Sequence, residues 1–352
     1  MMNEAKARRQ YKCDHPRGRL RGRGVSILMA ALSLLLPLAC ACAAGAARAG
    51  GYPSAPITVI VPTSAGGGMD LMARVVSMKM GQLLKTSFVV ENVPGANGII
   101  GAARVANAAP DGYTILLGQT SQMVINPYLY SNVSYDTFKS FVPVVRLSNA
   151  PNVVVVPNES PFHSLTDIVA AARKANAQGK SLNLATPGSG TVSHLTSVLF
   201  QQAARIEFSH IPYKGASSAI TDTIAGRDDL MMSSIPTSFG QIKAGQLRAV
   251  AVSADKRSTS LPDVPTIAEA GYPGFNAGTW YGFFVPAKTP PHIVDLLNKA
   301  ANEALQSPDV VKTIQSDGGD VIGGTSQAFM AVLEEDAAKW SKAVKESGAK
   351  VD

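Results

Sequence analysis

The sequence predicts an α/β protein in which parallel strands are covered by helices on both faces. Short runs of β-branched and apolar residues alternate along the chain with amphipathic segments of helical period. The chain has 352 residues, of which 46% are hydrophobic, 16% charged and 6% aromatic. This composition excludes a disordered protein and argues against a coiled coil. No low-complexity linker divides the chain, yet it is long for one sheet, so we expect two α/β lobes joined by crossing strands.

Residues 1–49 have the order of regions found in a secretory signal peptide. A basic region runs to Arg23, an apolar stretch covers 25–38, and small residues then end in an A-x-A cleavage pattern at Ala49. We therefore expect this leader to be removed on export and the mature chain to begin at Gly50.

The positive charge of the chain belongs to this leader. The formal net charge is +7, from 32 basic and 25 acidic side chains, and the leader holds nine of the former and two of the latter. Residues 50–352 therefore carry 23 basic and 23 acidic groups. A neutral body removes the main argument for a nucleic-acid-binding surface.

All three cysteines, Cys13, Cys40 and Cys42, also lie in the leader. The mature chain is expected to have no disulfide, no thiolate metal site and no cysteine nucleophile. A lipidated Cys40 or Cys42 is the alternative to soluble export, but Pro37 stands where a lipobox has leucine. No other stretch reaches ~18 apolar residues, so we expect no membrane span.

The expected strands are short β-branched or apolar runs bounded by glycine, proline and polar residues. In chain order they cover 57–61, 88–91, 114–117, 153–156, 182–185, 230–232, 249–252 and 283–285.

The expected helices follow from apolar spacing and from end signals. A helix over 70–84 has its apolar residues on one face, and Ser164 with Asp167 forms a capping box that opens a helix through 175. Further helices are expected over 191–204, before Gly226, from Pro291 to 305, and over 326–346.

The segment PITVIVPTSAGGGMD, residues 56–70, carries the clearest functional signal. A strand ends in small and glycine residues and a helix begins, so unpaired N–H groups lie at a positive helix end that suits an anion. A tight glycine turn of purely structural purpose is the alternative. The segment lacks the Walker A and dinucleotide-binding patterns. The candidate anion ligands are Ser64, Ala65, Gly66, Gly67 and Gly68.

Other strand ends repeat this design. Because the carboxyl ends of parallel strands meet at one edge, these loops predict a crevice that captures a small carboxylate largely through backbone groups. Lys214 is either a cation at the pocket mouth or a solvated turn residue. The candidate residues in these loops are Thr120, Ser121, Gly188, Ser189, Gly190, Thr191 and Lys214.

Catalysis, a metal site and a cofactor are not indicated. The mature histidines, which are His163, His194, His210 and His292, have no metal-ligand spacing, and no G-x-S-x-G motif occurs. We expect His194 to be a polar residue near a helix start. An exported α/β enzyme acting on carboxylates is the alternative, and it would have to use His194 with Ser189 or Ser193.

Several long blocks resemble the Bug/TctC family of extracytoplasmic solute receptors associated with tripartite tricarboxylate transporters. They include PITVIVPTSAGGGMD, VVENVPGANGIIGAARVANAAPDGYTILLG, HIPYKGASSAITD, IKAGQLRAVAVSADKRS and LPDVPTIAEAGYPGF, and they run in family order. The resemblance implies a two-lobed periplasmic-binding-protein fold of type II, a Venus flytrap with its ligand cleft between the lobes. It also implies a periplasmic, non-enzymatic protein that binds a small carboxylate and works with membrane transporter components.

The resemblance implies that lobe 1 comprises residues 52–152 plus 277–352 and that lobe 2 comprises 153–276. We expect a monomer. The chain departs from the family where an aromatic residue, a proline and an acid are usual. Thr63 and Ala65 occupy the first two places, and Ser233 and Ser234 follow Met232 where the acid is usual. Ser233 is therefore a further candidate ligand residue, and the missing acid favours a carboxylate without an amino group. The alternative within the receptor class is an orphan receptor that signals to a sensor partner.

Overall fold

The structure is a computed structural model that describes residues 51–316 and 318–349. One compact unit begins at Tyr52 and contains all the helices and strands below. The expected signal peptide, its cleavage site and the three cysteines lie outside the described residues.

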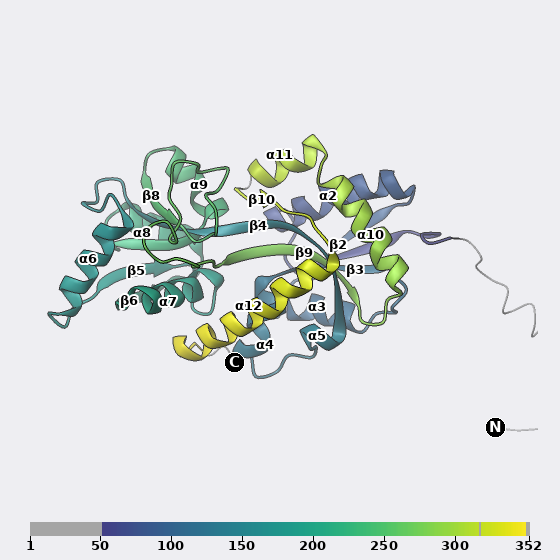
Figure 1. The fold of residues 1–352 in the computed structure, drawn as a ribbon, viewed down its shortest axis with the longest axis horizontal. Helices are drawn as coiled ribbons and strands as arrows, with labels where there is room; N and C mark the ends of the chain where they lie inside the picture. Colours follow the sequence, from purple (N-terminus) through teal and green to yellow (C-terminus); the bar gives the residue numbers. More distant parts are fainter. Residues whose placement is uncertain (1–50, 317, 350–352) are drawn as a thin grey trace, which may run out of the picture. The chain divides into compact units, whose positions relative to one another are not determined.

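Strands and helices alternate along most of this unit (Figure 1). The strands are β1 (Ile57–Val61), β2 (Phe88–Asn92), β3 (Thr114–Gln119), β4 (Phe141–Pro157), β5 (Leu182–Thr186), β6 (Phe208–Pro212), β7 (Leu230–Ser234), β8 (Leu247–Val252), β9 (Gly278–Pro286) and β10 (Asp320–Val321). The helices of eight or more residues are α2 (Gly68–Leu84), α3 (Ile99–Ala106), α6 (Leu165–Asn176), α7 (Val192–Ala204), α8 (Ala216–Ile224), α9 (Ile235–Lys243), α10 (Pro291–Ala304), α11 (Pro308–Ser316) and α12 (Ser326–Ser347). Short helical turns are η1 (Ala96–Gly98), η2 (Ser121–Ile125), α4 (Asn126–Leu129) and α5 (Thr137–Ser140).

The strands form one hydrogen-bonded path in the order β2-β1-β3-β9-β4-β7-β5-β6, with β8 and β10 also pairing with β4. Two sets of strands in this path are parallel, β2-β1-β3 and β7-β5-β6. The antiparallel strands β9 and β4 lie between the two sets. Each parallel set therefore has its own carboxyl edge, and the loops of the candidate site follow these two edges.

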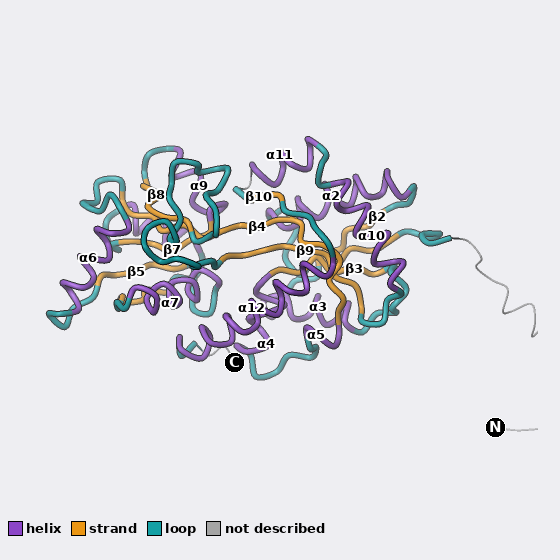
Figure 2. The backbone as a smooth tube through the Cα atoms, in the orientation of Figure 1, coloured by secondary structure: helices purple, strands orange, loops and turns teal. Residues whose placement is uncertain are grey.

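The long strand β4 links the two parts of the sheet. Its first part, through Pro151, pairs with β9, and its last part, from Asn152, pairs with β7 and β8. Figure 2 shows β4 and β9 running side by side between the two groups of helices. A strand shared in this way carries the chain between the two parts without a flexible linker.

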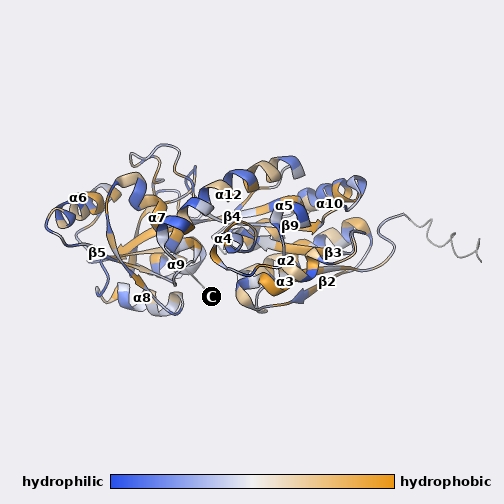
Figure 3. Cartoon of the chain, turned by 90° about the horizontal axis from the view of Figure 1, so that it is seen from below, coloured by the Kyte–Doolittle hydropathy of each residue, from blue (hydrophilic) through white to orange (hydrophobic). Residues whose placement is uncertain are grey.

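Four clusters of buried apolar side chains hold the helices against the sheet. One lies between α2, α10 and strands such as β1, and a second joins α3, η2, α12 and β9. The third and fourth pack α6 with α7, and α8 with α9, against the β5-β7 part. Figure 3 shows the same segregation, with hydrophobic residues on the strands and hydrophilic ones along the outer turns of the helices.

All eight expected strands are present, and β1 has the expected bounds. The capping box is confirmed, because Ser164 Oγ accepts from Asp167 N at 3.2 Å and the Asp167 carboxylate accepts from Ser164 N at 2.8 Å. Strands β6 and β10 and helices α3, α9 and α11 were not among the expected elements. β6, with the sequence FSHIP, is short, has two adjacent polar residues at Ser209 and His210 and ends in proline, so it lacks the strict alternation that signals a strand.

In the described part of the chain, no helix is both long enough and apolar enough to cross a membrane.

Candidate functional site

The first candidate loop joins β1 to α2. Ser64, Ala65, Gly66 and Gly67 are exposed and Gly68 is half-buried. Gly66 has φ 86°, a left-handed conformation that favours glycine, whereas Gly67 is the helix N-cap in an extended conformation with φ −85°. An added Cβ would meet no atom within 4 Å at either glycine. The loop is therefore open to solvent, and only Gly66 needs an unusual backbone conformation.

A buried carboxylate holds this loop. Asp70 is 3% exposed and accepts from the Gly66 N–H at 2.9 Å, and Arg74 pairs with it at 2.9 Å. Arg74 also donates to Asn92 Oδ1 at 3.2 Å, and Asn92 Nδ2 donates to Thr63 O at 3.1 Å. The Arg74 guanidinium keeps the pKa of Asp70 below its ordinary value, and the Gly66 N–H acts in the same direction. The positive end of α2 is thus already faced by a charged carboxylate.

The second candidate loop follows β3, the neighbour of β1. Thr120 is fully buried, and its hydroxyl accepts from Trp280 N at 2.9 Å and lies 3.4 Å from Gly278 O, both on β9. Ser121 is half-buried and begins η2. The Thr120 hydroxyl is therefore engaged by β9, and a direct role in binding a ligand stays a prediction. Trp280 is 2% exposed and packs in the core.

An amide cluster beside this loop was missed by the sequence analysis. Gln122 is 1% exposed, its Oε1 accepts from Gln119 N at 3.2 Å, and its Nε2 donates to Asn97 O at 3.1 Å. Asn97 Nδ2 donates to Asn126 Oδ1 at 2.9 Å. The sequence signal for this cluster is PGANG, whose two glycines flank residues with φ 44° and 51°.

The third candidate loop joins β5 to α7. Thr191 is the N-cap of α7, and its Oγ1 accepts from His194 N at 3.2 Å and donates to Gly188 O at 2.8 Å. Gly190 is buried with φ 72°, and its N–H donates to His194 Nδ1 at 3.0 Å. Ser189 is exposed at the tip of the loop. The loop is therefore tightly bonded to the first turn of its own helix.

His194 is stacked on a second histidine. The ring centroids of His194 and His210 are 3.9 Å apart and the rings are within 3° of parallel. His210 Nε2 lies 2.6 Å from the Oγ1 of Thr186, the last residue of β5. Burial lowers the pKa of His194 from 6.5 to about 4, and the neighbouring His210 acts in the same direction. Burial also lowers the pKa of His210. Both rings are neutral at neutral pH.

A buried asparagine connects α7 to the linking strand β4. Asn152 is 1% exposed, its Oδ1 accepts from Ser193 Oγ at 2.9 Å, and its Nδ2 donates to Thr196 Oγ1 at 2.8 Å. Its backbone N–H donates to Ser253 Oγ at 2.8 Å, and Ser253 also bonds Ala277, just before β9. The Ser193 hydroxyl is thus directed to Asn152 and not to His194, so these two adjacent residues do not form a nucleophile–base pair.

The fourth and fifth candidate loops follow β6 and β7. Tyr213 N donates to Thr186 O at 3.0 Å and Gly215 N to Pro187 O at 2.9 Å, so the β6–α8 loop lies against the β5–α7 loop. Lys214 is exposed in this loop. After β7, Ser233 is fully buried and its Oγ lies 3.3 Å from Ser234 O.

The structure thus gathers the candidate residues into two groups. One group, 64–68 with Thr120 and Ser121, follows the neighbouring strands β1 and β3. The other, 188–191 with Lys214 and Ser233, follows β5, β6 and β7. A cavity of about 680 Å³ beside Ser189 is lined by α7, the β6 region and the end of α12, and residues 64–68 take no part in it.

The charges at the two edges differ. No acidic residue lies in the first turn of α7, α8 or α9, whereas α2 has Asp70 there. The helix ends that follow β5, β6 and β7 therefore keep their positive potential. Among the residues described, no group of three or more His, Cys, Asp or Glu side chains could hold a metal ion.

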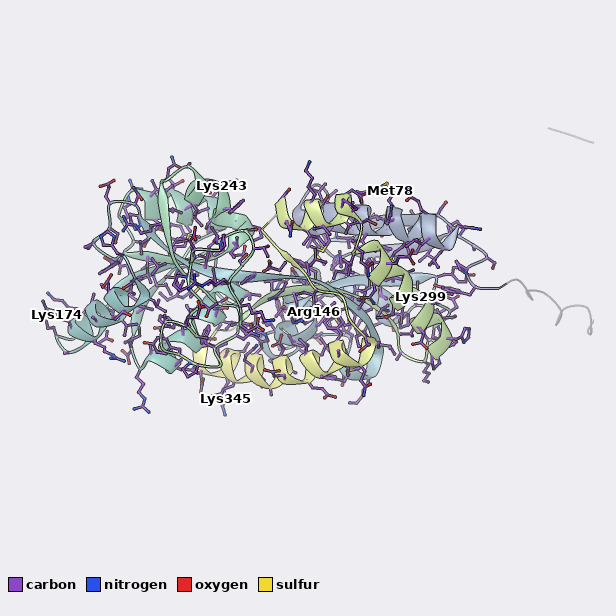
Figure 4. All side chains as sticks on the ribbon, turned by 45° about the horizontal axis from the view of Figure 1, so that its top comes forward. Met78, Arg146, Lys174, Lys243, Lys299 and Lys345 are labelled. Atoms are coloured by element: carbon purple, nitrogen blue, oxygen red, sulfur yellow. The ribbon has the colours of Figure 1, made fainter. Side chains whose placement is uncertain are left out.

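Several basic side chains lie on the outer faces of helices. Figure 4 shows Lys174, Lys243, Lys299 and Lys345 on the outside of α6, α9, α10 and α12, and all four are exposed. Arg146 is half-buried on β4, where burial lowers its pKa and the charge of Asp336 opposes this effect.

Comparisons with known proteins identify the relatives of this chain. The family described as "Tripartite tricarboxylate transporter family receptor" matches residues 72–349. A Pseudomonas sp. (strain P51) protein described as "UPF0065 protein in tcbD-tcbE intergenic region" is 40% identical over 302 residues, which cover 86% of this chain and 89% of that protein. Protein BugT of Bordetella pertussis is 35% identical over 301 residues, which cover 85% and 91%.

Solved structures of the same kind align along most of the chain. A TctC solute-binding protein from Polaromonas has a TM-score of 0.76 at 28% identity, covering 84% of this chain and 99% of that one. An R. palustris protein solved with adipate has a TM-score of 0.70 at 31% identity, covering 85% and 100%. MatC from Rhodopseudomonas palustris with bound malate has a TM-score of 0.67 at 30% identity, covering 83% and 100%.

These matches confirm the resemblance inferred from the sequence blocks, and the α/β fold is the two-lobed periplasmic-binding-protein fold of these relatives. The family consists of solute-binding receptors and not of enzymes, and it implies a periplasmic location. The chain belongs to the tripartite tricarboxylate transporter family of receptors and is a periplasmic solute-binding protein of the TctC/Bug type.

Proposed function

We propose that this receptor captures a small organic carboxylate and delivers it to a tripartite tricarboxylate-type transporter in the membrane. The main support is the electrostatics of the β5-β6-β7 edge, where three helices begin without an acidic residue in the first turn. Free N–H groups at such helix ends bind carboxylates. Relatives solved with adipate and with malate support the same ligand class.

The ligand residues proposed are those of the two groups of loops, with the ligand held between two lobes. Lobe 1 would comprise 52–152 plus 277–352 and lobe 2 would comprise 153–276. The two places where the chain passes between these lobes are then near Asn152 on β4 and near Ala277 before β9. These residues bond to Ser253, which makes this region the proposed hinge.

Export and delivery complete the proposal. The leader would be cleaved near Ala49, and the mature monomer would carry its ligand through the periplasm to the transporter. Mass spectrometry of the periplasmic form should find an N-terminus at or close to Gly50. A diacylglyceryl-modified Cys40 or Cys42 would contradict this.

A thermal-shift screen of mono-, di- and tricarboxylates tests the ligand class. A ligand that binds only the folded state adds about 2.7 kcal/mol to the unfolding free energy at 100 times its Kd, which gives a clear rise in Tm. We expect at least one of adipate, malate and related carboxylates to raise the Tm, whereas matched neutral amides should not. Scattering with that ligand should show compaction, and the absence of any carboxylate-dependent shift would refute the proposed ligand class.

A further inference from the structure

Two loops of the candidate site are built in the same way, with one chemical difference. In each, a glycine one residue before the helix N-cap has a positive φ, 86° at Gly66 and 72° at Gly190. In each, its N–H donates to the side chain at the third helical position, at 2.9 Å to Asp70 and at 3.0 Å to His194. The acceptor is a carboxylate at α2 and an imidazole at α7.

This difference changes the charge at the start of the helix. At α2 the Asp70 carboxylate is paired with Arg74 four residues on, whereas Val198 occupies the corresponding place in α7. A carboxylate at the third position of α7 would therefore lack this partner, would neutralise the positive helix end and would repel an incoming anion. A neutral imidazole satisfies the same glycine N–H through the lone pair of Nδ1 and adds no charge. The start of α7 is therefore ordered by a side chain and still keeps its positive potential.

We propose that His194 is a positioning residue of this receptor: as a neutral acceptor for the Gly190 N–H, it holds the Gly188–Thr191 loop in its binding conformation while leaving the α7 N-terminus free for an anionic ligand. The proposal rests on the proposed carboxylate-binding function. It assigns His194 no contact with the ligand.

His210, on the adjacent strand β6, holds the His194 ring in place. Its ring covers the face of His194, and its Nε2 lies 2.6 Å from Thr186 Oγ1, at the other end of the same loop. The two histidines thus hold the segment between Thr186 and Gly190 at both ends. A stacked pair of this kind tolerates at most one proton, because two imidazolium rings at this distance would repel each other.

The surroundings of the pair set its response to pH. His210 faces His194 from β6, and the carboxylates of Glu207, before β6, and Glu346, on α12, line the same cavity. Burial and the second ring oppose a proton on His194, and the positive end of α7 acts in the same direction. A proton on Nδ1 would remove the acceptor for Gly190, so acidification should release the loop.

Three substitutions at one position separate the roles of hydrogen bond and charge. His194→Asn places a neutral acceptor near the position of Nδ1, His194→Asp places a charged one there, and His194→Leu has none. His292→Asn, at an exposed histidine at the start of α10, is the matched control. Circular dichroism and Tm measurements would establish whether each variant is folded.

The first measurement needs no ligand. Amide hydrogen exchange at Gly190, followed by NMR, should be slow in the wild type, in His194→Asn and in His194→Asp, and at least tenfold faster in His194→Leu. As the pH falls from 7 to 4, the protection of the Gly190 amide against exchange should decrease in the wild type. The decrease is measured against the His194→Asn variant at the same pH. Equal protection of Gly190 in a folded His194→Leu variant would overturn the proposal.

The second measurement uses adipate and malate as probes, by calorimetry at pH 7. We expect His194→Asn to bind within about threefold of the wild type, and both His194→Asp and His194→Leu to bind at least tenfold more weakly. If His194→Asp and His194→Asn bind the probes equally well, the claim that the acceptor must be uncharged is overturned. If neither probe, nor any other carboxylate, binds the wild type, the proposed function fails, and Gly190 exchange still decides whether His194 positions the loop.

Discussion

At the scale of single residues, the glycine loops depend on backbone conformation more than on space. Gly66 and Gly67 both face open solvent, but only Gly66 has a positive φ. A residue with a Cβ pays about 1–2 kcal/mol in the left-handed region, and an extended N-cap glycine does not impose this cost.

We therefore expect Gly66→Ala to lower stability by about 1 kcal/mol and to weaken carboxylate binding up to about tenfold. Gly67→Ala is the matched control and should change both by much less. Calorimetry and thermal unfolding of the two variants make the comparison. Equal effects of the two substitutions would show that the conformation of Gly66 is unimportant.

Asp70 should tie the first loop to its helix through charge and hydrogen bonding together. Asp70→Ala leaves the Gly66 N–H and the Arg74 guanidinium without this acceptor. We therefore expect the unfolding free energy to fall by about 1–3 kcal/mol. Asp70→Asn keeps an oxygen acceptor for the Gly66 N–H, so it should lower the unfolding free energy by less than Asp70→Ala does.

The pH dependence of the Asp70 contribution follows from the sign of its pKa shift. The folded state holds the pKa below the ordinary value of 3.8, so the contribution is present above that value and is lost as the pH falls through the lower, folded-state pKa. Urea unfolding between pH 7 and pH 3 should show a larger acid loss for the wild type than for Asp70→Asn. Parallel pH profiles would contradict this account.

At the scale of elements, the start of α6 offers a test of stability away from the site. Ser164 and Asp167 form a complete capping box, and α6 packs Ile168 and Ala172 into the core. Ser164→Ala should cost about 1 kcal/mol of unfolding free energy. Ser87→Ala, at an exposed position directly before β2, is the control. Carboxylate affinity should stay unchanged in both variants, and a loss of affinity in Ser164→Ala would show that α6 is coupled to the site.

The hydrogen bonds that join Asn152 on β4 to Ser193 and Thr196 on α7, here called the bridge, should contribute to stability cooperatively. Asn152 contacts Ser193 and Thr196 in a buried environment, so Asn152→Ala should cost about 1–3 kcal/mol. Because Ser193 Oγ donates to Asn152 Oδ1, the effects of Asn152→Ala and Ser193→Ala on the unfolding free energy should not be additive. A double-mutant cycle should give a coupling energy of about 0.5 kcal/mol or more.

The control cycle for this bridge pairs Asn152→Ala with the distant Ser164→Ala, which should be additive within about 0.5 kcal/mol. Additivity in both cycles would mean that the bridge does not act as a unit.

At the scale of the whole molecule, the charge balance predicts how binding responds to salt. Residues 50–352 hold 23 basic and 23 acidic side chains, and the labelled lysines lie on the outside of helices. Helix ends act over one turn, so salt screens them less than it screens a long-range field.

The affinity for a bound carboxylate should therefore change by less than about threefold between 50 and 500 mM salt. Lys214→Gln should weaken binding less than Gly66→Ala does, because the hypothesis assigns the anion to backbone groups. Calorimetry over this salt range makes the measurement, and a steep salt slope that Lys214→Gln abolishes would instead assign the anion to that lysine.

Local sequence patterns determined the elements and the candidate loops. β-Branched runs, the Ser164 capping box and glycine-rich strand ends act over a few residues, so the alternation of strands and helices and the loops at 64–68 and 188–191 could be predicted. Even the acceptors Asp70 and His194 were within reach, since each stands three residues after a helix N-cap.

Only the tertiary structure decided which of these groups meet. The stacking of His194 on His210, the bond from Thr120 to β9 and the bridge from Asn152 to α7 join residues 16 to 160 positions apart. Sequence periodicity carries no information on such pairs, because a side chain's burial and partners depend on how β4, β9 and α7 pack together. The glycine-rich strand ends are thus determined by the local sequence, whereas the lowered pKa of His194 and the hydrogen bond of Thr120 to β9 are consequences of packing.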